Sequence, residues 1–275
     1  MKALISVDME GISGIVHSSE TNPERYDYQR GRELMTADAN AVIAGVLDAE
    51  PTADVLVADA HGTFRNLLPE RLDRRVRLVR GKPRALNMLA GLDEETDAAL
   101  FVGYHVRAGE GPGVLAHTMN GEILDVRVAG RSLGEIGLNA AMAGHLGVPV
   151  VLLSGDDAAC AEATDLLPGT VTVPVKEALG MAAAVTLHPE EARDRLRRAA
   201  ADAVTRRTEI PPLALTGPLD VEADLASPHT VDLATLVPGV SRAAGARTVA
   251  FTAPDYGSAY RLILLLAQLA TIRPA

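Results

Sequence analysis

The sequence predicts an α/β fold, in which a mostly parallel sheet is flanked by helices and a smaller C-terminal α+β unit follows. Short apolar runs rich in β-forming residues alternate with helical patterns, as is typical of parallel strands joined by helices. The rhythm changes in the last third of the chain, where Pro211-Pro212 interrupts it. We therefore expect an α/β unit over residues 1–185 and an α+β unit over residues 186–275, without a sharp boundary.

The first unit is expected to contain four buried strands. They are the runs Ala3–Val7, Val55–Ala58, Ala99–Tyr104 and Val148–Leu153. Each run is short and apolar throughout, which favours strands that are covered on both faces. Helices are predicted over about residues 28–49 and 133–146. Residues 123–128, followed by Ala129-Gly130-Arg131, predict a hairpin inserted before the second of these helices.

The second unit is expected to begin with an amphipathic, Arg-rich helix after His188-Pro189. The elements predicted beyond the two prolines are a strand over 214–226, a short helix over 231–236, a strand over 247–252 and a closing helix over 255–271. This strand-helix-strand-helix ending predicts the smaller α+β unit.

Composition argues against several classes of protein. The net charge is −10, aromatic residues make up 3% and tryptophan is absent, so we expect no nucleic-acid partner. A single cysteine excludes an intrachain disulfide. The apolar run at the N-terminus ends at Asp8, too short for a signal peptide, and the longest run, near residues 262–270, is far short of a membrane span. We therefore expect a cytoplasmic protein without a membrane partner.

One basic segment runs against the acidic charge of the chain. Its members are Arg71, Arg74, Arg75, Arg77, Arg80, Lys82 and Arg84. The segment flanks a short predicted strand over residues 76–79. We favour a solvated sheet edge over a phosphate-binding patch.

Acidic and histidine side chains follow three of the predicted strands, at the point where each strand ends. Asp8 directly follows the first strand, and Glu10, two residues on, can face the same side of an extended chain. His61 lies just beyond the second strand and His105 just beyond the third. Any one of them alone is better explained as a loop carboxylate or a hydrogen-bonded turn histidine. Because ligands of open parallel sheets bind outside the carboxyl ends of the strands, their convergence predicts a metal site.

Two further candidates are weaker on the residues alone. Glu135 lies in the first turn of the predicted helix, where an acid often only complements the helix dipole. His117 follows a glycine-rich segment that begins at Gly109, and a histidine in such a loop is often merely exposed to water. Pro112 and the lack of a following helix argue against a phosphate loop, so we interpret the segment as a flexible wall or lid.

Several long motifs occur in order along the chain. They are residues 6–14 (SVDMEGISG), 28–32 (YQRGR), 34–36 (LMT), 103–105 (GYH), 134–140 (GEIGLNA) and 154–157 (SGDD). Together they resemble the zinc-dependent D-aminopeptidases known from a bacterial dipeptide-transport operon, strongly over the first two-thirds of the chain and weakly over the rest.

The resemblance implies a set of site residues. Its metal ligands fall on Asp8, Glu10, His61, His105 and Glu135, and its proposed catalytic histidine falls on His117, within a segment 112–119 (PGVLAHTM) that matches the family pattern throughout. It also implies a homodecamer with an interior chamber.

Ligand counting refines the expected cofactor. A catalytic zinc usually keeps three protein ligands and an open position, so this larger mixed set of oxygen and nitrogen donors predicts two Zn²⁺ per chain that share a carboxylate. Asp8 is our choice for the shared ligand, because it comes first after the central strand. Such a pair can activate water and polarise the scissile carbonyl. We expect acid/base work from His117, with the family's nucleophile and an oxyanion stabiliser as the other roles.

The predicted function is that of a zinc-dependent metallo-aminopeptidase acting on short peptides or amides, with a preference for an N-terminal D-amino acid that rests on the resemblance alone. The alternatives are a two-metal hydrolase of another amide or ester and, in a different class, a dipeptide-binding transport component. The last would need a signal segment and would leave the clustered ligands unexplained.

Three residues are candidates for holding the ends of a substrate. Glu10, Asp156 or Asp157 could anchor its free amine, although Asp156-Asp157 is better explained as the cap and first turn of the next helix. Lys176 could meet a substrate carboxylate, but a solvated lysine is the favoured interpretation.

Overall fold

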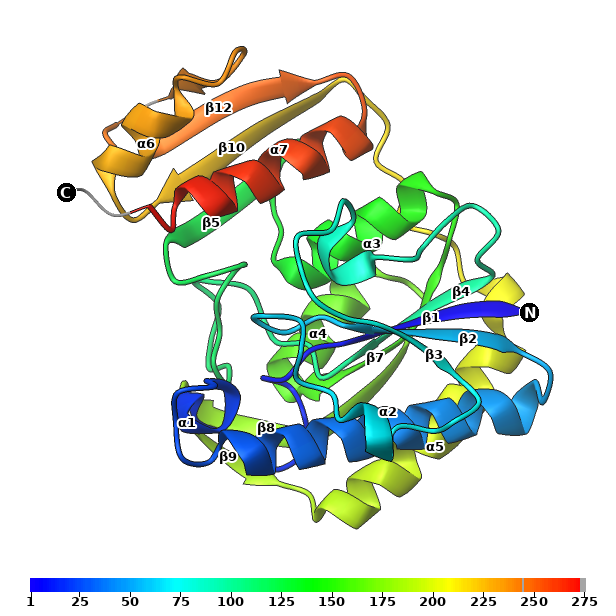
Figure 1. Ribbon diagram of the computed structural model, residues 1–275. Helices are drawn as coiled ribbons and strands as arrows, with labels where there is room; N and C mark the ends of the chain where they lie inside the picture. The colour runs from blue at the N-terminus through cyan, green and yellow to red at the C-terminus, as the bar shows by residue number, and fades with distance from the viewer. Residues whose placement is uncertain (244, 273–275) are drawn as a thin grey trace.

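The computed structural model describes residues 1–243 and 245–272, which form two sheets with helices packed around them (Figure 1). The first sheet has seven strands in the order β3-β2-β1-β4-β7-β8-β9, parallel throughout except at β8–β9. The second has five strands in the order β11-β12-β10-β5-β6 and is antiparallel. The predicted α/β class is therefore confirmed.

The elements have the following bounds. The first sheet consists of β1 Lys2–Val7, β2 Asp54–Asp59, β3 Arg77–Val79, β4 Ala98–Val102, β7 Val150–Asp156, β8 Val171–Gly180 and β9 Ala183–Thr186. The second consists of β5 Ile123–Val128, β6 Arg131–Ser132, β10 Leu219–Leu225, β11 Ser241–Arg242 and β12 Thr248–Ala253. The helices are α1 Ser18–Thr21, α2 Tyr28–Ala49, α3 Glu135–His145, α4 Asp157–Leu166, α5 Pro189–Thr205, α6 Pro228–Ala234 and α7 Tyr256–Leu269, with single 3₁₀ turns at Pro69–Arg71, Asn87–Leu89 and Arg207–Glu209.

Helices cover both faces of the first sheet. Helices α2 and α5 lie side by side on one face, at the bottom of Figure 1, and share an aliphatic core with β1 and β4. Helices α3 and α4 cover the other face, and α7 lies between α3 and the second sheet. A second core thus joins the two sheets through α7. Among the described residues, no helix has both the length and the apolar character needed to span a membrane.

The second sheet is assembled from two distant parts of the chain. The predicted hairpin is confirmed as β5 and β6, and β5 pairs with β10 from the C-terminal part. Helix α5, which opens the predicted second unit, instead packs against α2 beneath the first sheet. The two layers of the molecule therefore do not follow the order of the chain.

Every predicted strand and helix is present, and two differences at strand ends have clear causes. Strand β4 ends at Val102 rather than Tyr104, because Gly103 adopts a positive φ of 71°. A Cβ at Gly103 would lie 2.5 Å from the Asp8 carbonyl oxygen, so only glycine fits there. Strand β10 begins at Leu219 rather than residue 214, directly after Pro218, which has no N–H for a ladder.

The three strands that carry the candidate ligands end at the same level. Val7 of β1 pairs with Asp59 of β2 on one side and with Val102 of β4 on the other. The Asp8 amide donates to the Val102 carbonyl at 2.8 Å, and the Ala60 amide donates to the Val7 carbonyl at 2.8 Å. The residues that follow the three strands are therefore neighbours in space.

Candidate metal centre

The four strand-end side chains meet at the carboxyl edge of the first sheet. His61 Nδ1 lies 2.9 Å from Glu10 Oε2 and 3.2 Å from Asp8 Oδ1. His105 Nε2 lies 3.5 Å from Asp8 Oδ2. Asp8, Glu10 and His105 are at most 6% exposed. The predicted convergence is confirmed, and its cause is the common level at which β1, β2 and β4 end.

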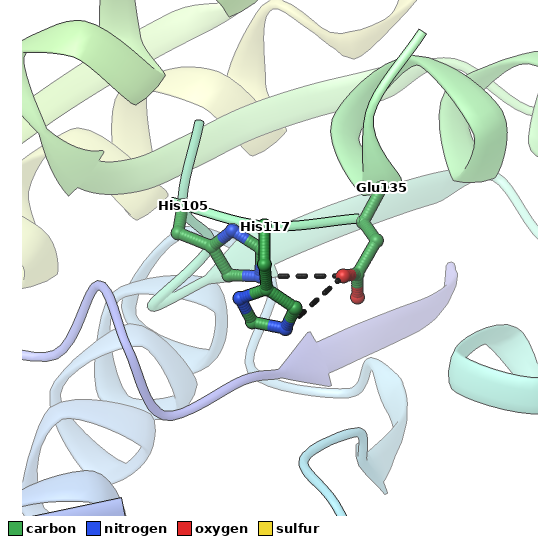
Figure 2. Close-up of side chains that lie close together, drawn as sticks. All are labelled: His105, His117 and Glu135. Atoms are coloured by element: carbon green, nitrogen blue, oxygen red, sulfur yellow. Dashed lines mark ion pairs between the residues drawn. The ribbon is translucent and has the colours of Figure 1, made fainter. Parts of the chain in front are cut away.

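Glu135 and His117 complete the same cluster (Figure 2). Glu135 Oε1 lies 3.3 Å from His105 Nε2 and 3.6 Å from His117 Nε2. The rings of His105 and His117 are stacked, with centroids 4.1 Å apart. Glu135 is in the first turn of α3, as predicted, but it is buried and faces the histidines. His117 belongs to the cluster rather than to an isolated, water-exposed loop.

Each histidine is held by one ring nitrogen and presents the other to the carboxylates. His61 donates through Nε2 to the Thr21 carbonyl at 3.0 Å. His105 and His117 donate through Nδ1 to the carbonyls of Val106 and Leu115, at 3.0 and 2.8 Å. A backbone carbonyl can only accept, so the other nitrogen of each neutral ring carries the lone pair. This is the arrangement found around histidines that ligate metals.

Two buried atoms at the centre of the cluster are unsatisfied. Among residues 1–243 and 245–272, Asp8 Oδ2 and His105 Nε2 have no hydrogen-bond partner, although they are only 3.5 Å apart. Leaving such groups without a partner is costly in a protein interior. A cation between them would satisfy both, and a mixture of carboxylate oxygens and imidazole nitrogens suits zinc. The donor set therefore fits a metal.

The donor atoms form two overlapping groups. Asp8, Glu10 and His105 present one set of ligand atoms within 4.8 Å of one another, and His105, His117 and Glu135 present another. The two oxygens of Asp8 face different histidines, Oδ1 towards His61 and Oδ2 towards His105. Asp8 thus lies between the two halves of the cluster.

The carboxylates of the metal-free cluster have pKa values that are pushed apart. Burial, aided by the neighbouring charge of Glu10, raises the pKa of Asp8 to about 8. Burial would also raise the pKa of Glu10, but the charge and hydrogen bond of His61 outweigh it and hold that pKa well below its usual range. The pKa of Glu135 is lowered in the same way, by the positive charge of His105 against the effect of burial.

The pKa values of the three histidines are also shifted in different directions. Burial favours the neutral form of His105, yet the charge of Glu135 and then of Asp8 raises its pKa to about 10. His61, beside Glu10 and Asp8, also has a pKa raised well above its usual value against the effect of burial. Burial and the neighbouring charge of His105 lower the pKa of His117. His117 is therefore the neutral histidine of the three near pH 7, the state suited to accepting a proton.

A cavity of about 520 Å³ opens onto the cluster. Its lining includes Asp8, His61, His117 and Glu135 of the cluster, together with Leu264, Ala267 and Gln268 of α7. The side chain of His117 is 26% exposed, compared with 1% for His105. His117 is therefore the stacked histidine that a molecule in the cavity can reach.

Lys176 departs from both interpretations offered by the sequence. It is only 3% exposed, and its Nζ donates to the carbonyls of Glu10, Ile12 and Ile15 at 2.6, 3.0 and 2.5 Å. It is neither a solvated lysine nor a group free to meet a substrate. The ammonium instead fixes the loop that carries Glu10.

The register of β8 explains why the sequence hides this role. Gly155 of β7 pairs with Pro174, but the next residue, Asp156, pairs with Lys176. This shift breaks the alternation of faces, so both Val175 and Lys176 are buried. A strict period of two would have placed Lys176 on the opposite side from Val175.

The predicted helix cap at Asp156 is confirmed. Its Oδ1 accepts from the Ala159 amide at 2.8 Å at the start of α4, and its Oδ2 accepts from the Val114 amide at 2.7 Å. Asp156 therefore anchors the segment that carries His117 and is occupied by backbone donors. Asp157 accepts from the Ala178 amide at 2.8 Å.

Asp59 and Asn66 form a supporting pair that was not predicted from the sequence. Asp59, the last residue of β2, accepts from the backbone amides of Asn66 and Leu67 and from Asn66 Nδ2 at 2.5–2.7 Å. Asn66 Nδ2 also donates to the His61 carbonyl at 2.6 Å. The pair closes the loop that positions His61. The sequence carries one signal for this pair, which is that the apolar strand β2 ends in an acidic residue.

Comparison with known proteins gives a consistent result. The family model described as peptidase M55, D-aminopeptidase, matches residues 1–265. The chain is 36% identical over 270 residues to the D-aminopeptidase of Bacillus subtilis (strain 168), with 98% of each protein covered. It also matches the solved structure of "Zn-dependent D-aminopeptidase DppA from Bacillus subtilis, a self-compartmentalizing protease", with a TM-score of 0.96, 35% identity and 100% coverage of both chains.

Proposed function

This chain belongs to the D-aminopeptidase family of peptidases, and we propose that it is a zinc-dependent aminopeptidase that releases N-terminal D-amino acids from short peptides or amides. One observation carries the proposal. Three histidines, each anchored through one ring nitrogen, present the other to three buried carboxylates at the wall of a substrate-sized cavity. The geometry provides donors for a metal, and the cavity provides space for a peptide beside them.

We propose that Asp8, Glu10, His61, His105 and Glu135 hold two zinc ions. The two oxygens of Asp8 face different histidines, which supports Asp8 as the ligand shared by both ions. Bound zinc would supply an activated water and polarise the scissile carbonyl. Lys176 and Asp59 keep the loops of Glu10 and His61 in place while this happens.

His117 is proposed to transfer the proton. Its lone pair on Nε2 faces the cluster, its side chain is reached from the cavity, and its lowered pKa leaves it neutral near pH 7. It can therefore accept a proton from the attacking water and deliver it to the leaving amine. The hydrogen bond from Nδ1 to the Leu115 carbonyl keeps the ring oriented during both transfers.

The test compares matched substrates on zinc-loaded protein of measured metal content. We expect two zinc ions per chain and hydrolysis of D-alanyl-p-nitroanilide at least about a hundredfold faster than the L-isomer, since stereochemistry decides whether the scissile carbonyl reaches the metals. An L preference would contradict the D-specific part. Cleavage of a phosphoester reporter alone would favour another two-metal hydrolase, and protein that binds no zinc would contradict the whole proposal.

We also propose that the chain acts in the cytoplasm as a homodecamer, and the description of the similar solved structure as self-compartmentalizing supports an assembly. The β8–β9 hairpin supports an assembly, because Leu179, Met181 and Val185 are 58–63% exposed and lie close together in sequence. Apolar side chains grouped on a surface mark a contact site. Light scattering of the purified protein should give ten times the mass of one chain, and a monomer at micromolar concentration would contradict this.

A further inference from the structure

The wall of the cavity beyond the metal cluster carries two cations. Arg84 and Lys82 line the same space as Asp8 and His117. Both lie over the ring of Phe64, with the Arg84 guanidinium carbon at 4.1 Å and Lys82 Nζ at 5.6 Å from its centroid. One cavity is therefore lined both by carboxylates of the cluster and by two cations.

Arg84 is held rigidly beside the cluster. Its Nη2 donates to the Asp59 carbonyl at 2.7 Å, and its Nη1 donates to the Val79 carbonyl at 3.3 Å. Asp59 is two residues before the proposed ligand His61, so the guanidinium is tied to the same strand end as the cluster. Two of its five N–H donors are used in this way. The remaining donors are preorganised, and a planar guanidinium suits a carboxylate.

The Arg84 guanidinium is stabilised by the charge of Asp59 but forms no ion pair within the described residues. Within the described residues, neither Arg84 nor Lys82 forms an ion pair with an acid, and Arg84 Nε is buried without a hydrogen-bond partner. Asp59 is nearby, but backbone and amide donors occupy its carboxylate. Burial lowers the pKa of Arg84 despite the charge of Asp59, an electrostatic cost that an arriving anion would relieve.

Three other arginines of the basic segment behave differently. Arg71 pairs with Glu33, Arg75 with Asp73 and Arg77 with Asp54, each at 2.6–3.1 Å and on the surface. These ion pairs confirm the predicted solvated edge for that part of the segment. Arg84 and Lys82 are the members that turn into the cavity, so a separate role is needed for them.

We propose that Arg84, assisted by Lys82, binds the C-terminal carboxylate of a short peptide substrate. This inference rests on the proposed function, because it places the scissile bond at the metal cluster. Each residue advances an extended chain by about 3.3–3.6 Å, so one or two residues beyond that bond fit within a cavity of this size. Longer or amidated peptides would place no charge beside the guanidinium.

The experiment compares D-alanylglycine with D-alanylglycinamide, which differ only in the terminal charge. The zinc-loaded wild-type protein should prefer the free acid by about tenfold or more in kcat/KM. Arg84→Gln should lower kcat/KM on the acid by about ten- to a hundredfold, mainly through KM, as expected for loss of a charge-assisted hydrogen bond. On the amide the change should stay within about twofold. Arg80→Gln removes the same charge from an exposed position outside the cavity and should change neither substrate.

Each outcome has a defined meaning. Equal losses on both substrates in Arg84→Gln would show that Arg84 only supports the fold, and would overturn the inference. Lys82 is exposed, so Lys82→Glu provides the test if the first variant does not fold; an unchanged KM for the acid in that variant would overturn the inference. A wild-type protein that cleaves acid and amide equally well overturns the inference and leaves the proposed function standing. If it cleaves neither, both fail.

Discussion

The carboxyl edge of the first sheet gathers three buried carboxylates and three imidazoles, of which that of His105 is buried, whereas the outer face of the second sheet carries one guanidinium surrounded by three carboxylates. In the second arrangement Arg127 reaches Asp125 and Asp224 at 2.7 Å and Glu222 at 2.9 Å, and all of these side chains are partly exposed. In the first, Asp8 Oδ2 and His105 Nε2 lack partners within the described chain. The charged groups of the second sheet are therefore paired with one another, whereas the cluster of the first sheet contains atoms without a partner.

The difference shows where the fold leaves charged groups without protein partners. The second sheet alternates buried and outward residues along β10, so its charges stay at the surface and find partners there. The first sheet is covered on both faces, so charges at its edge are buried, and in the cluster of Asp8 and His105 two of the atoms have no partner among the described residues. A related criterion, a partly buried charge without an ion pair, separates Arg84 from Arg71, Arg75 and Arg77 of the same segment.

The largest expected effect comes from removing a proposed ligand. His105→Ala should lower zinc content and reduce kcat/KM by about a thousandfold or more, because both groups of donor atoms include His105. Metal analysis and kinetics on a D-alanyl reporter measure this. Full zinc occupancy in the variant would show that His105 is not a ligand and would weaken the contrast between the sheets.

His117→Ala should separate binding from catalysis within the same cluster. We expect both zinc ions to be retained and kcat to fall by about 10²–10⁴-fold, the range found when a general acid/base is lost. His188→Ala, which changes an exposed helix cap, serves as the matched control. Unchanged activity would exclude the proton-transfer role, and lost zinc would make His117 a ligand.

Lys176→Met tests whether the buried support matters for the site. The change keeps a long side chain but removes the donor to three carbonyls, so the loop of Glu10 should relax. Zinc affinity should weaken by about 10–100-fold, as for other supporting contacts around metals. Competition with a chromophoric chelator measures this. A variant that only unfolds at lower temperature, with unchanged zinc affinity, would make Lys176 purely structural.

Metal-free protein should respond to pH in a way that zinc-loaded protein does not. The folded pKa of Asp8 is raised from 3.8 to about 8 and that of His105 from 6.5 to about 10. Stability from a raised pKa is fully present below the unfolded value and is lost as pH rises through the folded one, here between about pH 4 and 10. Zinc binding should therefore release protons at pH 7.

Thermal unfolding and calorimetry measure this response. The Tm difference between zinc-loaded and chelated protein should widen from pH 6 to pH 9, and the heat of zinc binding should depend on the ionisation enthalpy of the buffer. A constant Tm difference together with no buffer dependence would mean that these groups hold no protons without the metal.

The smallest effect is expected at the paired charges of the second sheet. Arg127→Gln should cost no more than about 1 kcal/mol in the free energy of unfolding, since exposed ion pairs contribute little. Arg127 lowers the pKa of Asp224, so its contribution is present above the unfolded pKa and is lost as pH falls through the folded one, at acid pH. Denaturant unfolding at pH 7 and pH 3 measures this, and a loss of zinc or activity would contradict the separation of the two sheets.

The sequence by itself determined the elements and four of the site residues. Apolar runs and helical patterns depend on near neighbours in the chain, so they predicted the strands, the hairpin and helix α2. Asp8, Glu10, His61 and His105 followed from a rule of parallel sheets, because strand ends meet at one edge. On the residues alone, simpler explanations were favoured for Glu135 and His117. Only the family resemblance made them candidates for the site.

Only the tertiary structure decided which charges have partners. It joined β5 to β10 across the chain, turned Lys176 inward through a register shift, and placed Glu135 and His117 against His105. It also separated Arg84 from arginines that look the same in sequence. The physical reason is that periodicity is local, whereas burial and ion pairing depend on segments brought together from distant parts of the chain.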